Sequence, residues 1–111
     1  MNDIISEKIP VIYAYKLYLP DRYSYIKIGY TEQNPQSMIF NETAWSKVNA
    51  DIVLVRTAIK NNGRILTASE FHEYLKQLGY RELRSGIDHF GWFRCEPKDI
   101  IAAYKHLIGN P

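Results

Sequence analysis

The chain has 111 residues, of which 46% are hydrophobic and 23% are charged, and its formal net charge is +2. This length fits one domain over residues 10–111 after a loose lead-in at 1–9, and the apolar runs are too short for a membrane protein. Cys95 is the single cysteine, which excludes an internal disulfide and favours a reducing, cytoplasmic location. A buried structural role is favoured for Cys95, because a catalytic cysteine usually needs a partner base.

The first half of the chain predicts a β-hairpin. Residues 11–18 form a β-like run that is apolar and aromatic on both of its sides, and residues 23–30 are a second β-like run, with Ile26 and Ile28 on one face. Between them, Pro20 is well placed to set a turn over residues 19–22. Tyrosines recur along both runs, and tyrosine suits a half-buried sheet as well as base stacking.

A helix and a third strand are expected next. Asn34 is a suitable N-cap and Pro35 a suitable first helical residue, for a helix that runs to about Val48. Residues 51–59 are apolar on both sides, which predicts a central strand covered on both faces. A turn is expected at 61–63.

The last part of the chain predicts two helices separated by a short strand. Thr67 and Glu70 have the spacing of a capping box at the start of the first of these helices, and Gly79 ends it. The aromatic segment 90–95 is expected to be a strand anchored in the core, and Pro97 starts the final helix. The order of elements indicates an α+β fold.

Several short motifs occur in a fixed order along roughly residues 10–108. They are Val-Ile-Tyr at 11–13, Lys-Ile-Gly at 27–29 with Thr31 after it, Asn62-Gly63, the segment from Thr67 to His72, and Trp92-Phe93. This series resembles the GIY-YIG nuclease superfamily, in the branch found in phage or mobile-element proteins and in domains attached to restriction-type helicases. The resemblance implies a central three-stranded, mostly antiparallel sheet that starts with a β-hairpin and is flanked by about three helices.

The resemblance also implies a reaction, the hydrolysis of nucleic-acid phosphodiesters with a divalent ion, Mg²⁺ or Mn²⁺. DNA is expected rather than RNA. In that reaction the first-motif tyrosine, Tyr13, would activate water. Our candidates for the remaining roles are Tyr30, for contact with the phosphate or proton transfer, and Glu70 with His72, for the metal or proton-transfer side. This chemistry needs a base, cationic help for the phosphate and a metal near the leaving oxygen. The candidate nucleic-acid contacts are the basic residues Lys27, Arg64, Arg84 and Arg94.

Three positions depart from the family pattern. Met38 stands where a helical arginine is expected, Ala68 where the metal-binding acid is expected, and Gly91 where an acidic residue often precedes the aromatic pair. We therefore expect an atypical or impaired catalytic set. Tyr13 can equally be an ordinary strand residue, and Glu70 can serve the helix cap alone. A non-catalytic nucleic-acid-binding domain and a protein-interaction module with a protein partner are the alternatives on the same scaffold.

Overall fold

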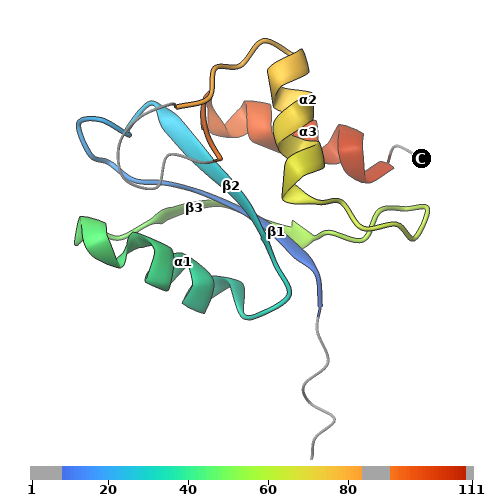
Figure 1. The fold of residues 1–111 in the computed structure, drawn as a ribbon, viewed down its shortest axis with the longest axis horizontal. Coiled ribbons are helices and arrows are strands. Elements are labelled where there is room, and N and C mark those ends of the chain that lie inside the picture. Colours follow the sequence, from blue (N-terminus) through green and yellow to red (C-terminus); the bar gives the residue numbers. More distant parts are fainter. Residues whose placement is uncertain (1–8, 84–90, 110–111) are drawn as a thin grey trace, which may run out of the picture.

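The computed structural model describes residues 9–83 and 91–109, which form a four-stranded sheet and three α-helices (Figure 1). The strands are β1 (Val11–Lys16), β2 (Tyr25–Thr31), β3 (Asp51–Thr57) and β4 (Trp92–Arg94), and the helices are α1 (Pro35–Thr43), the 3₁₀ turn η2 (Ala44–Ser46), α2 (Ala68–Gln77) and α3 (Pro97–Gly109). Within these residues no helix is long and apolar enough to span a bilayer.

The sheet has the strand order β3-β1-β2-β4, and each neighbouring pair is antiparallel. The expected hairpin is confirmed, and its two strands are the central pair. The expected number of three strands is wrong, because β4 joins the sheet beside β2, where Trp92 lies opposite Lys27. The connection between β1 and β2 is longer than predicted, since it spans residues 17–24 rather than 19–22. Within it, the backbone N–H groups of Arg22 and Tyr23 both donate to the Leu19 carbonyl.

The prediction that residues 51–59 form a central strand is also wrong. β3 lies at the edge of the sheet, and only Leu54 of its residues is buried, while Ile52 is 47% exposed. The pairing with β1 shifts register between Ala14 and Tyr15, which face Leu54 and Ile52 respectively. This bulge interrupts the simple alternation of faces. An apolar run indicates burial in general, but it does not say which strands will have neighbours on both sides.

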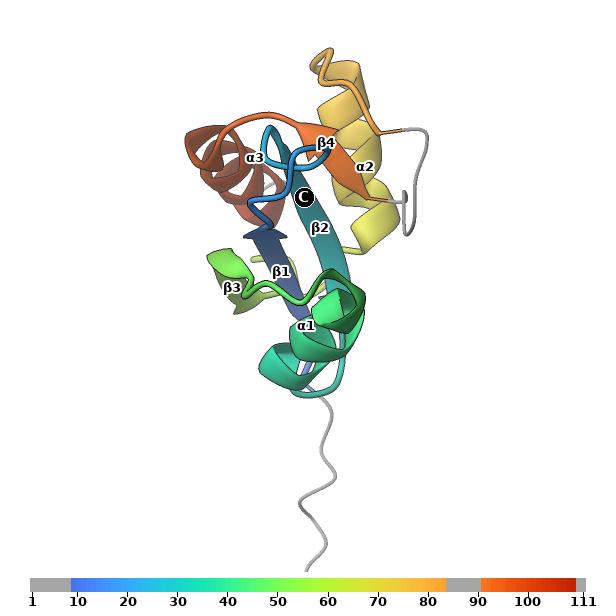
Figure 2. The ribbon, with the colours of Figure 1, turned by 90° about the vertical axis from the view of Figure 1, so that its left-hand side faces the viewer.

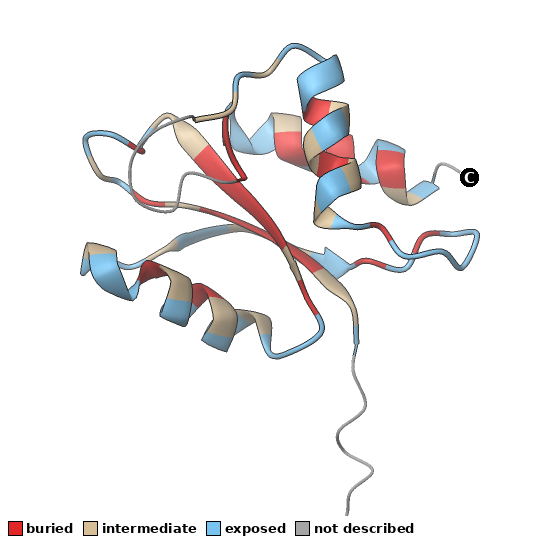
Figure 3. Cartoon of the chain, viewed as in Figure 1, coloured by how far each residue is buried: buried red, intermediate tan, exposed pale blue. Residues whose placement is uncertain are grey.

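The helices lie on both sides of the sheet, with α1 on one face and α2 and α3 on the other (Figure 2). Because successive side chains of a strand point to opposite faces, Tyr13 and Tyr15 of β1 point toward α1, and Ile12 and Ala14 point toward α2 and α3. We call these the α1 face and the α2/α3 face. Most of β1 and β2 is buried between the two layers, whereas the outer sides of the helices are exposed (Figure 3).

The predicted helix starts are confirmed. The Asn34 side chain accepts the backbone N–H of Ser37 at 3.0 Å, and the Thr67 hydroxyl accepts that of Glu70 at 3.1 Å. Both are N-caps that satisfy donors without a partner inside the helix. Gly79 follows α2 with φ of +95°, in the left-handed region that favours glycine at the end of a helix.

The first helix is shorter than predicted. α1 ends at Thr43 rather than near Val48, because the chain tightens into η2 and Lys47 then adopts a left-handed conformation with φ of 60°. The Thr43 hydroxyl donates to the Ile39 carbonyl at 2.8 Å inside the final turn. The shorter helix places Glu42 in the last turn of α1, beside the sheet.

Candidate functional site

The two strands of the hairpin bring their motif residues together. Tyr13 of β1 lies directly opposite Gly29 of β2. A Cβ atom at Gly29 would overlap the Cζ and hydroxyl oxygen of Tyr13, so the tyrosine ring occupies the space that a side chain would need. Tyr13 is only 2% exposed. The glycine of the Lys-Ile-Gly motif therefore has a packing role, which is to let the Tyr13 ring lie across β2.

Glu42 is the polar partner of the strand tyrosines. Its Oε2 accepts the hydroxyl of Tyr13 at 2.5 Å, and its Oε1 accepts the hydroxyl of Tyr15 at 3.0 Å. The two tyrosine rings are parallel to within 2°, with centroids 6.2 Å apart. Glu42 is half-buried, and its two hydrogen bonds join α1 to β1.

Trp92 lies at the centre of a second group of contacts on the same face. The Tyr15 ring meets the indole edge to face at 5.6 Å. The guanidinium carbon of Arg22 lies 4.9 Å from the indole centroid, and the Lys27 ammonium lies 6.0 Å from it. Arg22 is 1% exposed and Lys27 is 8% exposed. We call this set the Trp92 cluster, and it consists of Tyr13, Tyr15, Arg22, Lys27, Glu42 and Trp92.

The indole N–H of Trp92 is buried and has no hydrogen-bond partner within the described residues. This is unusual, because the large majority of buried polar groups in proteins are paired. Arg22 also stacks against Trp45 at 5.2 Å, and its Nε lies 3.5 Å from the Asp21 carboxylate, which is exposed. Two cationic groups and an N–H donor around one ring can bind an oxygen-rich anion, since arginine and lysine are the side chains that most often bind phosphate.

Sequence reasoning found Tyr13 and Lys27 of this cluster but missed Glu42 and Arg22. The expected arginine was sought on the first helix, whereas Arg22 comes from the connection between β1 and β2. Glu42 follows the buried Ile39 by three residues, so helical periodicity places the two on neighbouring sides of α1. That spacing was the one available signal for Glu42.

The other predicted catalytic residues lie elsewhere. Glu70 belongs to α2 on the α2/α3 face, and its Oε2 accepts a hydrogen bond from the nearly buried Lys60 at 2.5 Å. The hydroxyl of Tyr30 donates to Glu32 at 2.8 Å, and burial together with this carboxylate raises the pKa of Tyr30. The sheet separates Glu70 from Tyr13.

His72 also lies on α2, at the edge of the α2/α3 face. Its Nε2 is 2.9 Å from the Ile28 carbonyl, and its ring packs against Phe93. Burial lowers the pKa of His72 below the ordinary histidine value. Gly91 lies against this ring, so that a Cβ there would come within 3.2 Å of it. In this arrangement His72 is a half-buried ring bonded to the backbone.

The predicted arginine contacts are not part of the Trp92 cluster. Arg64 is exposed in the turn before α2, and Arg94 is exposed at the end of β4. Arg84 lies outside the described residues. Of the three basic residues proposed from the sequence that the structure describes, Lys27 is the one in the Trp92 cluster, where it lies opposite Tyr15.

The residues present do not fit the expected magnesium or manganese ion. Glu70 is paired with the Lys60 ammonium, and both oxygens of Glu42 accept tyrosine hydroxyls. Throughout residues 9–83 and 91–109, no group of three or more His, Cys, Asp or Glu side chains comes together to hold a metal. We therefore derive no chemical step through a metal.

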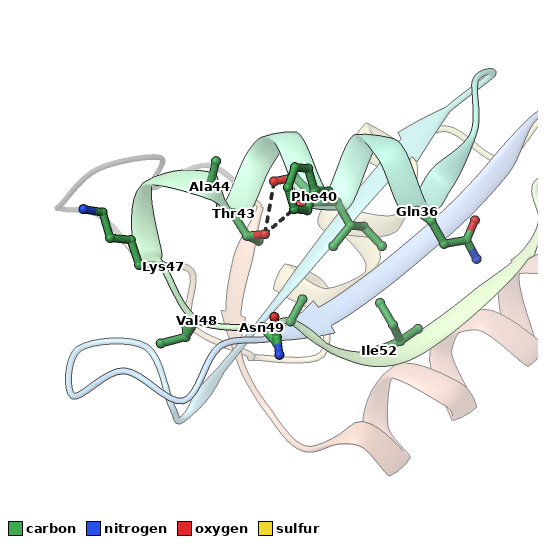
Figure 4. Close-up of a pocket in the computed structure, with 10 residues that line it drawn as sticks. Gln36, Phe40, Thr43, Ala44, Lys47, Val48, Asn49 and Ile52 are labelled. Carbon is green, nitrogen blue, oxygen red and sulfur yellow. Dashed lines mark hydrogen bonds between the residues drawn. The ribbon is translucent and has the colours of Figure 1, made fainter.

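An open groove of about 520 Å³ lies between α1 and the edge strand β3 (Figure 4). Apolar side chains line much of it, including Phe40, which is 72% exposed, and Ile52. None of the residues of the Trp92 cluster lines this groove.

Comparison of the chain with known proteins found no matching family model, no matching curated protein and no matching solved structure. The GIY-YIG resemblance therefore depends on the short motifs of the sequence. The geometry adds one fact to it, which is that the first and second motifs face each other across the central strand pair.

Proposed function

We propose that this chain is a GIY-YIG-type domain that binds nucleic acid through the Trp92 cluster and does not cleave it by metal-dependent hydrolysis. The observation that carries the proposal is the position of Arg22 and Lys27, which both lie against Trp92 on the face that holds Tyr13. We expect the domain to bind DNA rather than RNA, and binding assays with both nucleic acids test this preference.

The positive charges of Arg22 and Lys27 support nucleic-acid binding better than the net charge of the chain does. The net charge of +2 gives only a weak general attraction for a polyanion. Arg22 and Lys27 both carry a positive charge close to Trp92, and arginine and lysine side chains supply many of the contacts that proteins make with nucleic-acid phosphates. Contacts of this kind release counterions from the nucleic acid, so binding should weaken strongly as salt increases.

Among the described residues, the α1 face holds no group of three or more acidic, histidine or cysteine side chains that could bind a metal, which supports binding over cleavage. Glu70 is engaged by Lys60 on the other side of the sheet, and Ala68 offers no ligand at the position where the family has its acid. Met38 packs beside the cluster in place of the expected arginine.

A second candidate function is hydrolysis that uses Glu42 in place of the missing acid, and the short hydrogen bond between Tyr13 and Glu42 favours it. In that reaction the attacking water would give a proton to Tyr13 as the Tyr13 hydroxyl passes its own proton to Glu42 Oε2. The water oxygen would bond to phosphorus while one bridging P–O bond breaks, and the leaving oxygen would take a proton from solvent. Arg22 and Lys27 would then stabilise the charge that develops on the phosphate.

The test combines binding and cleavage by the full chain. Labelled single- and double-stranded oligonucleotides are titrated at increasing salt, with Lys27→Gln as the cluster variant and Arg64→Gln as a matched loss of charge outside the cluster. We expect salt-dependent binding that Lys27→Gln weakens and Arg64→Gln leaves largely unchanged. Circular dichroism of each variant checks that it is folded.

Supercoiled plasmid is incubated in parallel with Mg²⁺ or Mn²⁺, using wild type, Tyr13→Phe and Glu42→Gln. The proposal predicts no cutting. Cutting by wild type that both variants lose would establish the second candidate instead. Absence of any binding at low salt by folded wild type would overturn the proposal and favour a protein-interaction module.

A further inference from the structure

We propose that this chain forms a symmetric homodimer in which β3 of one copy pairs antiparallel with β3 of a second copy, so that the two sheets become one continuous sheet. The pairing places Asp51 of each copy opposite Arg56 of the other copy. This surface is separate from the Trp92 cluster, and the dimer does not depend on the proposed function.

The outer side of β3 is the open edge of the sheet. Among the described residues β3 pairs with β1 alone, and Figure 2 shows it at the margin of the sheet. The opposite margin is covered beside β4, because the backbone N–H of Leu83 donates to the Trp92 carbonyl and that of Arg94 donates to the Arg81 carbonyl. An uncovered edge strand presents backbone N–H and C=O groups that can pair with another strand.

The bulge in β3 decides which residues of two copies can face each other. Two consecutive residues of β1, Ala14 and Tyr15, lie opposite Leu54 and Ile52. Val53 is therefore the extra residue of β3. Val53 packs with Leu54 on the α2/α3 face, whereas Ile52 lines the groove beside α1. Two adjacent residues thus share a face, and the alternation of faces is offset by one position across the bulge.

Because of this offset, the two charged residues of β3 lie on the same face. Asp51 is opposite Lys16, which follows Tyr15 in β1 and so points away from α1. Arg56 is opposite Ile12, which is buried on the α2/α3 face. Asp51 and Arg56 therefore both belong to the α2/α3 face, one near each end of the strand.

This arrangement makes the edge of β3 complementary to itself. In an antiparallel pair of identical strands related by a twofold axis perpendicular to the sheet, directly opposed residues share a face. The register with Asp51 opposite Arg56 meets this condition, and it sets Ile52 opposite Val55, which are both on the α1 face. In a strand without the bulge, the same register would put opposed residues on different faces. The pairing forms two Asp51–Arg56 contacts, one at each end.

Both charged residues are exposed and available for this contact. The Asp51 carboxylate accepts the Tyr18 hydroxyl at 2.9 Å, and the Arg56 guanidinium donates to the Val55 carbonyl at 2.9 Å. Neither belongs to a salt bridge within residues 9–83 and 91–109. Opposite charges that face each other across antiparallel strands stabilise the pairing, and like charges destabilise it.

Apolar surface beside the edge supports the same pairing. Ile52 is 47% exposed, and it borders the α1–β3 groove together with Phe40, which is 72% exposed (Figure 4). The twofold axis sets the grooves of the two copies side by side along the shared strands. Pairing therefore removes part of this apolar surface from water, which favours association.

The test measures the mass of the full chain by sedimentation equilibrium over a range of concentrations. We expect a monomer–dimer equilibrium in wild type. Arg56→Asp should weaken the dimer at least about tenfold, because it sets like charges opposite each other at both ends of the strand pair. Lys98→Asp is the matched control, since it makes the same change of charge at a side chain of α3 that is 81% exposed. It should leave the dimer unchanged.

Charge exchange between copies tests the register itself. Asp51→Arg alone should weaken the dimer as Arg56→Asp does. Mixing these two single variants should produce a heterodimer, because opposite charges then face each other at both ends again. Circular dichroism checks that each variant is folded. Wild type that stays monomeric up to its solubility limit would overturn the proposal. A dimer that both single variants leave intact, or folded single variants that do not associate when mixed, would overturn it as well.

Discussion

The hydroxyl of Tyr13 donates a 2.5 Å hydrogen bond to Glu42, which links the central strand β1 to the last turn of α1. The same carboxylate accepts the hydroxyl of Tyr15 at 3.0 Å. Tyr13, which the sequence motifs predict to be catalytic, is thus part of a hydrogen-bonded bridge between β1 and α1.

We expect Tyr13→Phe to lower the free energy of unfolding by about 1–2 kcal/mol, because it removes a hydrogen bond to a half-buried charged acceptor. In a Glu42→Ala background the same change should cost much less, since the acceptor is already absent. Urea unfolding of the two single variants and the double variant measures this coupling. An equal cost in both backgrounds would show that the bond does not contribute.

Gly29→Ala should destabilise the fold by about 1–3 kcal/mol, because its new methyl group would overlap the Tyr13 ring. Gly109→Ala is the matched control, since a Cβ there meets only Asn61 at 3.6 Å. Thermal and denaturant unfolding compare the two. Equal tolerance of alanine at both glycines would contradict the packing role of Gly29.

The stability that depends on His72 should fall at acidic pH. Burial is the main cause of its lowered pKa, and repulsion from Lys27 and Lys76 adds to it. The hydrogen bond to Ile28 and the Glu82 carboxylate act in the opposite direction. The net effect is a lowered pKa, so folding favours the neutral form of His72.

The unfolded chain therefore binds more protons than the folded chain as pH falls below about 6.5, and the free energy of unfolding decreases. His72→Gln can still donate to the Ile28 carbonyl but cannot titrate. We expect the stability advantage of wild type over His72→Gln to shrink between about pH 7.5 and about pH 5. A constant or growing advantage over this range would contradict the assignment.

Cys95 should be unreactive in the native protein. Burial, with a smaller effect of Asp99, raises the pKa of its thiol to about 12. An ordinary thiol with a pKa of about 8.5 has on the order of a thousandfold more thiolate at neutral pH. Alkylation by iodoacetamide, followed by mass spectrometry, should be far slower in native than in urea-unfolded protein. Similar rates in the two states would show that Cys95 is accessible and activated.

Local rules predicted much of the fold. Asn34, Thr67 and Gly79 mark helix ends because capping depends on residues close in sequence. The hairpin followed from two adjacent β-like runs. The edge position of β3 could not be predicted, because Ile52 and Leu54 have the same apolar character in an edge strand as in a central one.

The candidate site was less accessible to sequence reasoning. Tyr13 and Lys27 were found because the motifs contain them. Glu42 is 29 residues from Tyr13, and its role follows from where α1 ends over the sheet. Arg22 reaches Trp92 from a connection whose conformation no local pattern specified. Such long-range convergence is a property of the packed fold.

The NMR signal of the Trp92 indole N–H in isotope-labelled protein, followed during titration with a DNA oligonucleotide, shows whether nucleic acid binds at the Trp92 cluster. The Trp45→Phe variant assigns this signal, because the chain has two tryptophans. Binding at the cluster should produce a large chemical-shift change of the Trp92 N–H, together with chemical-shift changes at Lys27 and Gly29. Shifts confined to the α1–β3 groove near Phe40, or binding that leaves the Trp92 signal unchanged, would contradict this binding site.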